Sequence, residues 1–134
     1  TGKLQDLLEA NRIILESMTA NVAGDVDEAS RIVGTVIIEP GATVIDSSIR
    51  GPVVIGTGTH VEHSYIGPFS SIADGCRIVD SELEHSVLLE GAQILGVSRI
   101  TDSLIGRGAV VQRSDEQPRA LRMHISDDSD VRIP

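Results

Sequence analysis

Small and aliphatic residues recur between Ser30 and Val111 in a repeat of five or six residues. Each repeat contains one aliphatic residue, and the residue two positions before it is small. Residues two apart on a β-strand point to the same face, so each repeat sends one small and one aliphatic side chain inward before the chain turns. This period is typical of a parallel β-helix, whose stacked coils bury one continuous core. The aliphatic positions are Ile32, Ile38, Val44, Ile49, Ile55, Val61, Ile66, Ile72, Ile78, Leu83, Leu89, Ile94, Ile100, Ile105 and Val111, and the small ones are Ser30, Val36, Ala42, Ser47, Val53, Thr59, Ser64, Ser70, Cys76, Ser81, Val87, Ala92, Ser98, Ser103 and Ala109.

A longer period groups these repeats in threes, because a glycine returns once in every third repeat. This is expected if one corner of each coil needs a backbone with positive φ. Three repeats per coil predict about five coils, which rise roughly 24 Å at the usual strand separation of about 4.8 Å. The sequence therefore predicts a mainly β protein, with one parallel β-helix over residues 30–113. The glycines are Gly41, Gly58, Gly75, Gly91 and Gly108.

The first 29 residues are expected to form an amphipathic helix, to about residue 19, and a polar linker over residues 20–29. Thr1 is a candidate N-cap, and Gly24 marks the stop. The end of a solenoid exposes backbone edges and apolar interior, so we expect the helix to cover the first coil around Ile32 and Val36, or a neighbouring subunit. Its apolar stripe comprises Leu4, Leu7, Leu8, Asn11, Ile14, Leu15 and Met18.

Residues 114–134 form a tail in which the repeat has stopped. Apolar and polar residues alternate on both sides of an acidic turn at residues 126–130. This alternation predicts a short strand or weak hairpin that covers the far end of the β-helix or packs against one of its faces. The apolar positions are Leu121, Met123, Ile125, Val131 and Ile133.

Composition narrows the class of protein. Tyr65 and Phe69 are the only aromatic residues among 134, which suits the narrow interior of a β-helix. The formal charge of −9 argues against a general affinity for nucleic acids or anionic lipids. No apolar run reaches membrane-spanning length. The single cysteine, Cys76, falls on a small inward position, so we expect a buried thiol and a reducing, cytoplasmic location.

Sequence signatures of catalysis are absent: there is no glycine-rich nucleotide loop, P-loop, zinc-binding histidine pair or serine nucleophile elbow. We therefore expect no metal or cofactor site in these residues. Two classes of function stay open. One is a structural, oligomerising domain, and the other is an acyltransferase whose general base is a histidine at a cleft between subunits. The candidates for that base are His60, His63 and His85.

One corner of the coils carries polar pairs, which are separated by equal intervals of three repeats. Stacking would place the first member of each pair in one outward column, with His63 between two carboxylates, Asp46 and Asp80. We expect this arrangement to raise the affinity of His63 for a proton. The simplest interpretation is a ladder of hydrogen bonds on the surface. The pairs are Asp46-Ser47, His63-Ser64 and Asp80-Ser81.

Three segments carry a family resemblance: TGKLQDLLEANR at residues 1–12, EHSVLLEG at residues 84–91, and the ending from Arg119 to Ile133. Each resembles the carboxyl-terminal region of long-form glucose-1-phosphate thymidylyltransferases. Together they extend the resemblance over essentially the whole chain. Their specificity is moderate, because many sugar-phosphate nucleotidylyltransferases carry hexapeptide repeats at their carboxyl end.

The resemblance implies a two-part enzyme that forms homo-oligomers, with a trimer favoured. In that family, an amino-terminal nucleotidyltransferase domain joins glucose 1-phosphate to dTTP with Mg²⁺, releases pyrophosphate, and is followed by a left-handed β-helix. The family's nucleotide-binding loop is missing from these residues, and its metal-holding aspartate lies upstream of the Thr-Gly pair. We therefore expect an excised carboxyl-terminal domain, without catalytic residues of its own, that serves oligomerisation and support. The alternative is a hexapeptide-repeat acyltransferase acting on a sugar or amino-sugar phosphate.

Overall fold

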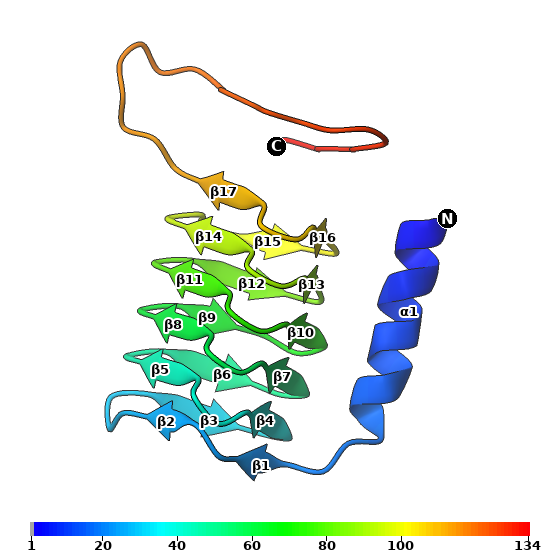
Figure 1. The fold of residues 1–134 in the computed structure, drawn as a ribbon, viewed down its shortest axis with the longest axis vertical. Helices are drawn as coiled ribbons and strands as arrows, with labels where there is room; N and C mark the ends of the chain where they lie inside the picture. The colour runs from blue at the N-terminus through cyan, green and yellow to red at the C-terminus, as the bar shows by residue number, and fades with distance from the viewer. Residues whose placement is uncertain (1) are drawn as a thin grey trace.

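The computed structural model describes residues 2–134 as a β-helix with one helix along its side and an extended tail (Figure 1). The helix, α1, spans Lys3–Glu16, with Gly2 at the N-cap position and Ser17 at the C-cap position, so it ends before Gly24, where the sequence placed the stop. The expected cap, Thr1, lies outside the described residues.

Short parallel strands stack into three sheets after α1. Sheet A has the order β1-β4-β7-β10-β13-β16, sheet B the order β2-β5-β8-β11-β14-β17, and sheet C the order β3-β6-β9-β12-β15. Each full coil gives one strand to each sheet, which confirms the predicted β-helix of about five coils. The strands are β1 (Asn21–Val22), β2 (Asp25–Val26), β3 (Arg31–Val33), β4 (Val36–Ile38), β5 (Thr43–Ile45), β6 (Ser48–Arg50), β7 (Val53–Ile55), β8 (His60–Glu62), β9 (Tyr65–Ile66), β10 (Ser70–Ile72), β11 (Arg77–Val79), β12 (Glu82–Glu84), β13 (Val87–Leu88), β14 (Gln93–Leu95), β15 (Ile100–Thr101), β16 (Leu104–Ile105) and β17 (Val110–Gln112).

The core consists of the inward aliphatic side chains, which lie one above another in successive coils. In sheet C, for example, Ile49, Ile66 and Leu83 are in register, and each is at most 1% exposed. The predicted aliphatic positions from Ile38 to Ile94 are buried with one exception, and those of the end coils are half-buried. Close packing of this kind leaves each interior side chain surrounded by other apolar groups.

The exception is Leu89, which was predicted to point inward and instead points outward. Leu88 takes its place and is 1% exposed. Val87, predicted as a small inward residue, also points outward, and Ser86 is buried in its place. Ile66 and Ile72 are six residues apart, whereas their partners in the next coil, Leu83 and Leu88, are only five apart. The corner in the later coil is one residue shorter, so the side chains after it change faces.

A second difference occurs at Ser98, a predicted small inward position that is exposed. Val97 packs against the core instead, and its amide donates to Ser81 Oγ at 3.0 Å. Before this point Val79 pairs with Leu95, and after it Leu83 pairs with Ile100. The number of residues that separates the two partners along the chain is larger by one in the second pair. The extra residue bulges out of the coil.

The expected polar linker carries two strands. β1 pairs with β4 and β2 pairs with β5, so the β-helix begins near Asn21 rather than Ser30. The edge of the coil that contains β4 and β5 is therefore covered by the strands that precede it. Val26, on β2, packs against the core of that coil.

The helix lies along sheet A, so the expectation that it covers the first coil is wrong. It runs beside the stacked strands of this sheet (Figure 1), and Leu8 and Leu15 are 3% and 2% exposed. Asn11 donates to the carbonyl of Phe69 at 3.2 Å and accepts a hydrogen bond from Ser71 of β10. The outward residues of this sheet are mostly apolar, which gives α1 a surface to pack on. They are Ile37, Val54, Ser71, Val87 and Leu104.

The tail forms no strand after β17 in the described residues, so the predicted hairpin is not made by paired strands. The chain turns back at residues 127–128, and residues 112–134 are exposed. Figure 1 shows this segment as an extended loop beyond the last coil. Its alternating apolar residues have no strand beside them in this chain.

Candidate functional site

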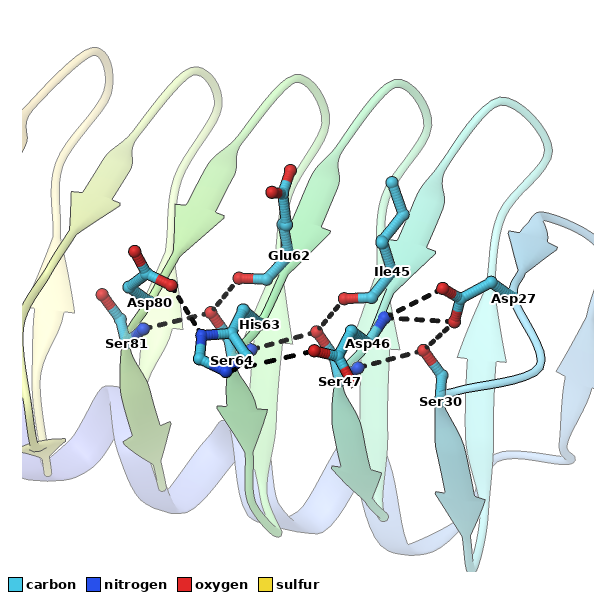
Figure 2. Close-up of polar contacts among 10 residues, drawn as sticks. All are labelled: Asp27, Ser30, Ile45, Asp46, Ser47, Glu62, His63, Ser64, Asp80 and Ser81. Atoms are coloured by element: carbon cyan, nitrogen blue, oxygen red, sulfur yellow. Dashed lines mark hydrogen bonds and ion pairs between the residues drawn. The ribbon is translucent and has the colours of Figure 1, made fainter.

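The corner between sheets B and C carries the polar column that the sequence predicts. Asp46, His63 and Asp80 occupy it in three successive coils, with φ of 45°, 48° and 49°. Aspartate and histidine are among the residues that adopt this left-handed conformation most readily without glycine. The same backbone geometry therefore aims all three side chains outward, in one row (Figure 2).

His63 lies between two carboxylates. Its Nδ1 is 2.7 Å from Asp80 Oδ1, and its Nε2 is 4.0 Å from Asp46 Oδ2. The hydrogen bond to Asp80 raises the pKa of His63 above its ordinary value, and the negative charges of Asp80 and Asp46 raise it further. The imidazole is 69% exposed, so water weakens these interactions and the pair contributes little to stability.

A ladder of serine hydroxyls runs beneath the column (Figure 2). Ser47 Oγ donates to the carbonyl of Ile45 at 2.7 Å and accepts from the amide of Ser64 at 3.1 Å. Ser64 and Ser81 repeat this pattern one and two coils later. Each hydroxyl thus satisfies one group in its own coil and one in the next, which explains why a serine follows each residue of the column.

An open groove of about 720 Å³ follows this corner. Its lining side chains come from four coils, and it adjoins a second groove of about 500 Å³ that includes Leu95 and Arg113. Asp80 and Ser98 line both grooves. The residues of the first groove are Asp46, Ser48, His63, Ser64, Tyr65, Asp80, Ser81, Glu82 and Ser98.

The other two candidate histidines lie elsewhere. His60 points outward from β8 in sheet B, with Nε2 2.9 Å from Glu62. His85 lies at the corner that follows sheet C, where its Nδ1 is bonded to Asp102 and its ring meets Phe69 edge-on at 6.2 Å. The structure therefore gives each histidine its own carboxylate and does not gather them into one site. Asp102 was not predicted from the sequence, although it follows His85 at the same interval that separates the members of the first column.

In the part of the chain that the structure describes, neither the buried cysteine nor any cluster of acidic and histidine side chains adds a further candidate site. Cys76 is buried, as predicted; its thiol donates to the carbonyl of Leu89 at 3.2 Å, and burial raises its pKa. Among residues 2–134, no three His, Cys, Asp or Glu side chains are placed to hold a metal ion together. No helix within the same residues has the length and apolarity needed to cross a bilayer.

Replacing Asp80 with asparagine is expected to lower the pKa of His63, because the substitution removes its closest negative charge. Folding raises this pKa above its unfolded value of about 6.5. The contribution of His63 to stability is therefore complete below that value and is lost as the pH rises through the higher folded-state pKa. An NMR titration of the His63 ring protons measures the shift. Asp74→Asn, at another corner, is the control, and an equal titration of His63 in wild type and Asp80→Asn would contradict the assignment.

Fold and site together define a hexapeptide-repeat β-helix domain with a polar groove along one corner. No family model matches the chain. Curated relatives do. Two are named glucose-1-phosphate thymidylyltransferase: one from Streptomyces griseus, 47% identical over 133 residues, and one from Streptomyces antibioticus, 45% identical over 133 residues. A third, the low-salt glycan biosynthesis nucleotidyltransferase Agl11 of Haloferax volcanii, is 31% identical over 136 residues.

These matches cover 99% of this chain but only 38%, 37% and 38% of the three relatives. The chain thus spans well under half the length of the curated relatives that it matches. The resemblance seen in the three sequence segments is confirmed, and it extends along the whole β-helix and the tail. The chain is thus similar to one part of each of these longer relatives.

Proposed function

We propose that this chain is the carboxyl-terminal β-helix domain of a glucose-1-phosphate thymidylyltransferase-like enzyme, in which it serves oligomerisation and support. The match to two thymidylyltransferases over 99% of the chain carries this proposal. In the reaction, the parent enzyme joins glucose 1-phosphate to dTTP and releases pyrophosphate. The nucleotide and Mg²⁺ bind to an amino-terminal nucleotidyltransferase domain of the same polypeptide. The greater length of the relatives supports the presence of such a domain.

The polar side chains on the surface of the β-helix agree with a supporting role. Each candidate histidine is paired with a carboxylate at a separate place on the surface, and the groove is lined by hydroxyls and carboxylates rather than by an enclosed apolar pocket. A cytoplasmic location is part of the proposal. It fits a domain whose only cysteine is a free, buried thiol.

We infer a homotrimer from the distribution of covered and uncovered faces. Sheet A is covered by α1, whereas sheets B and C have no element of the described chain over them. In a cyclic trimer, each subunit presents two different surfaces to its neighbours. Sheets B and C can supply these surfaces, since they meet at the corner of His63. Ile45, Val79 and Leu95 place half-buried apolar side chains on the outside of sheet B.

Acyl transfer onto a sugar or amino-sugar phosphate is the second candidate, and the His63–Asp80 pair favours it. A carboxylate that holds one imidazole nitrogen can orient the ring for general-base catalysis by the other. Two features weigh against this role. Nε2 faces Asp46 rather than a group that could bind an acyl donor, and no long loop is inserted between the coils from β1 to β17 to close the groove.

Separated from the rest of the enzyme, the 134-residue chain is expected to form the same oligomer but to lack nucleotidyltransferase activity. With glucose 1-phosphate, dTTP and Mg²⁺ it should release no pyrophosphate above background, whereas the longer protein that contains it should. In sedimentation at tens of micromolar it should run as a trimer. A monomer would contradict the oligomerising role. Pyrophosphate release by the chain alone, or acyl transfer lost in His63→Ala, would overturn the non-catalytic assignment.

A further inference from the structure

One flank of α1 carries apolar side chains that the β-helix does not bury. Leu8 and Leu15 face sheet A and are almost fully buried, but Leu4 and Leu7 are each 39% exposed and Ile14 is 66% exposed. At 3.6 residues per turn, Leu7 and Ile14 lie nearly in line along the helix, and Leu4 lies between this line and the face of Leu8 and Leu15. We call Leu4, Leu7 and Ile14 the apolar flank.

The opposite flank of α1 carries charged side chains that are exposed to solvent. Arg12 pairs with Glu9, with Nη2 2.6 Å from Oε1, and also with Glu16. These ion pairs lie at i, i+3 and i, i+4 on an exposed surface, where such pairs are common. The two sides of α1 therefore differ, although neither is covered by residues 2–134. A helix that only shielded sheet A would need apolar residues on the face of Leu8 and Leu15 alone.

We propose that the apolar flank is the surface on which the nucleotidyltransferase part of the same polypeptide docks, an inference that rests on the proposed function. More than half of each thymidylyltransferase relative lies outside the match. This remainder needs a contact on the β-helix if the two parts are to hold a fixed orientation. Docking there would bury three large aliphatic side chains that otherwise face water.

The small size of the flank selects a tethered partner over a second copy. Stable association between separate proteins buries about 800 Å² on each side, far more than three partly exposed side chains provide. A domain joined by a short linker experiences an effective concentration on the order of millimolar, so a small apolar contact is sufficient to hold it. The trimer proposed above uses sheets B and C and leaves this flank accessible.

Two adjacent isoleucines provide a matched test. Ile14 belongs to the flank, whereas Ile13 is 59% exposed on the side of α1 that faces away from Leu8 and Leu15. Ile14→Glu and Ile13→Glu add the same charge to the same helix. In the longer protein, we expect Ile14→Glu to speed proteolytic cleavage between the two parts about tenfold or more. Ile13→Glu should be cleaved at the wild-type rate.

Measurements on the 134-residue chain separate docking from folding. There both variants should keep the wild-type thermal midpoint and sedimentation coefficient, because neither side chain is buried. Equal cleavage of Ile14→Glu and Ile13→Glu in the longer protein would overturn the docking surface. A changed sedimentation of the short chain only in Ile14→Glu would also overturn it, by showing that a second copy occupies the flank. Pyrophosphate release is measured on the unaltered longer protein. Its absence refutes the proposed function, and its presence with equal cleavage refutes the docking alone.

Discussion

Ile72→Asp is expected to abolish the cooperative thermal transition of the β-helix. Ile72 is 1% exposed on β10, between Ile55 of the preceding coil and Leu88 of the next. Losing a buried isoleucine side chain costs roughly 2–5 kcal/mol, and an unpaired carboxylate in an apolar interior costs still more. Together these costs approach the whole stability of a typical domain, about 5–15 kcal/mol.

Arg77→Asp is the control, because Arg77 points outward from the neighbouring strand β11 and is exposed. Its neighbours in register are His60 and Gln93, which tolerate a carboxylate in water. Circular dichroism during heating measures both variants. If Ile72→Asp kept the wild-type transition, the inward register of the coils would be wrong.

Deleting residues 2–18 is expected to lower the melting temperature and to promote aggregation. The deletion removes Leu8 and Leu15, each worth roughly 1.5–3 kcal/mol when fully buried. It also exposes the apolar outer column of sheet A, including Ile37, Val54 and Val87, and a contiguous apolar strip favours self-association. The melting temperature and light scattering of the truncated chain report the two effects.

Leu15→Asp tests the same contact without truncation, with Ile14→Asp as its control. Leu15 is 2% exposed and Ile14 is 66% exposed, so only the first substitution should lower the melting temperature. An unchanged melting temperature after deletion of residues 2–18 would show that the packing of α1 on sheet A does not stabilise the β-helix.

The fold was predictable because every repeat of a β-helix has the same geometry. In each repeat, only the residue that points inward has to be identified from two neighbours. That decision is ambiguous where both neighbours are large and apolar. Leu88 and Leu89 are such a pair, and a corner of either length fits the repeat. Val97 and Ser98 were predicted wrongly for a different reason, since a bulge exchanges their faces without changing the residues around them.

The position of α1 required a second pattern. In four of five coils, the residue just before the inward aliphatic position of this sheet is itself apolar, as at Ile37, Val54 and Leu104, and the exception is Ser71. These residues point away from the core and form the strip on which α1 lies. The tail offered no equivalent, because alternation such as that at Leu121 and Met123 defines a strand only when a partner strand is present.

The site was predictable to the extent that it follows the coil period. That period placed Asp46, His63 and Asp80 in one column, and it also joins His85 to Asp102. The serine ladder was less visible, since its bonds depend on the rotamer of each hydroxyl. The groove is formed by side chains of four coils together, which no single repeat encodes.

The serine ladder also makes the length of this domain adjustable in evolution. Ser47 and Ser64 each donate within their own coil and accept from the following one. Duplicating or losing one coil would therefore leave no hydroxyl or amide of the ladder without a partner. The domain can grow or shrink in steps of about 4.8 Å, as a spacer whose length changes while its cross-section stays the same.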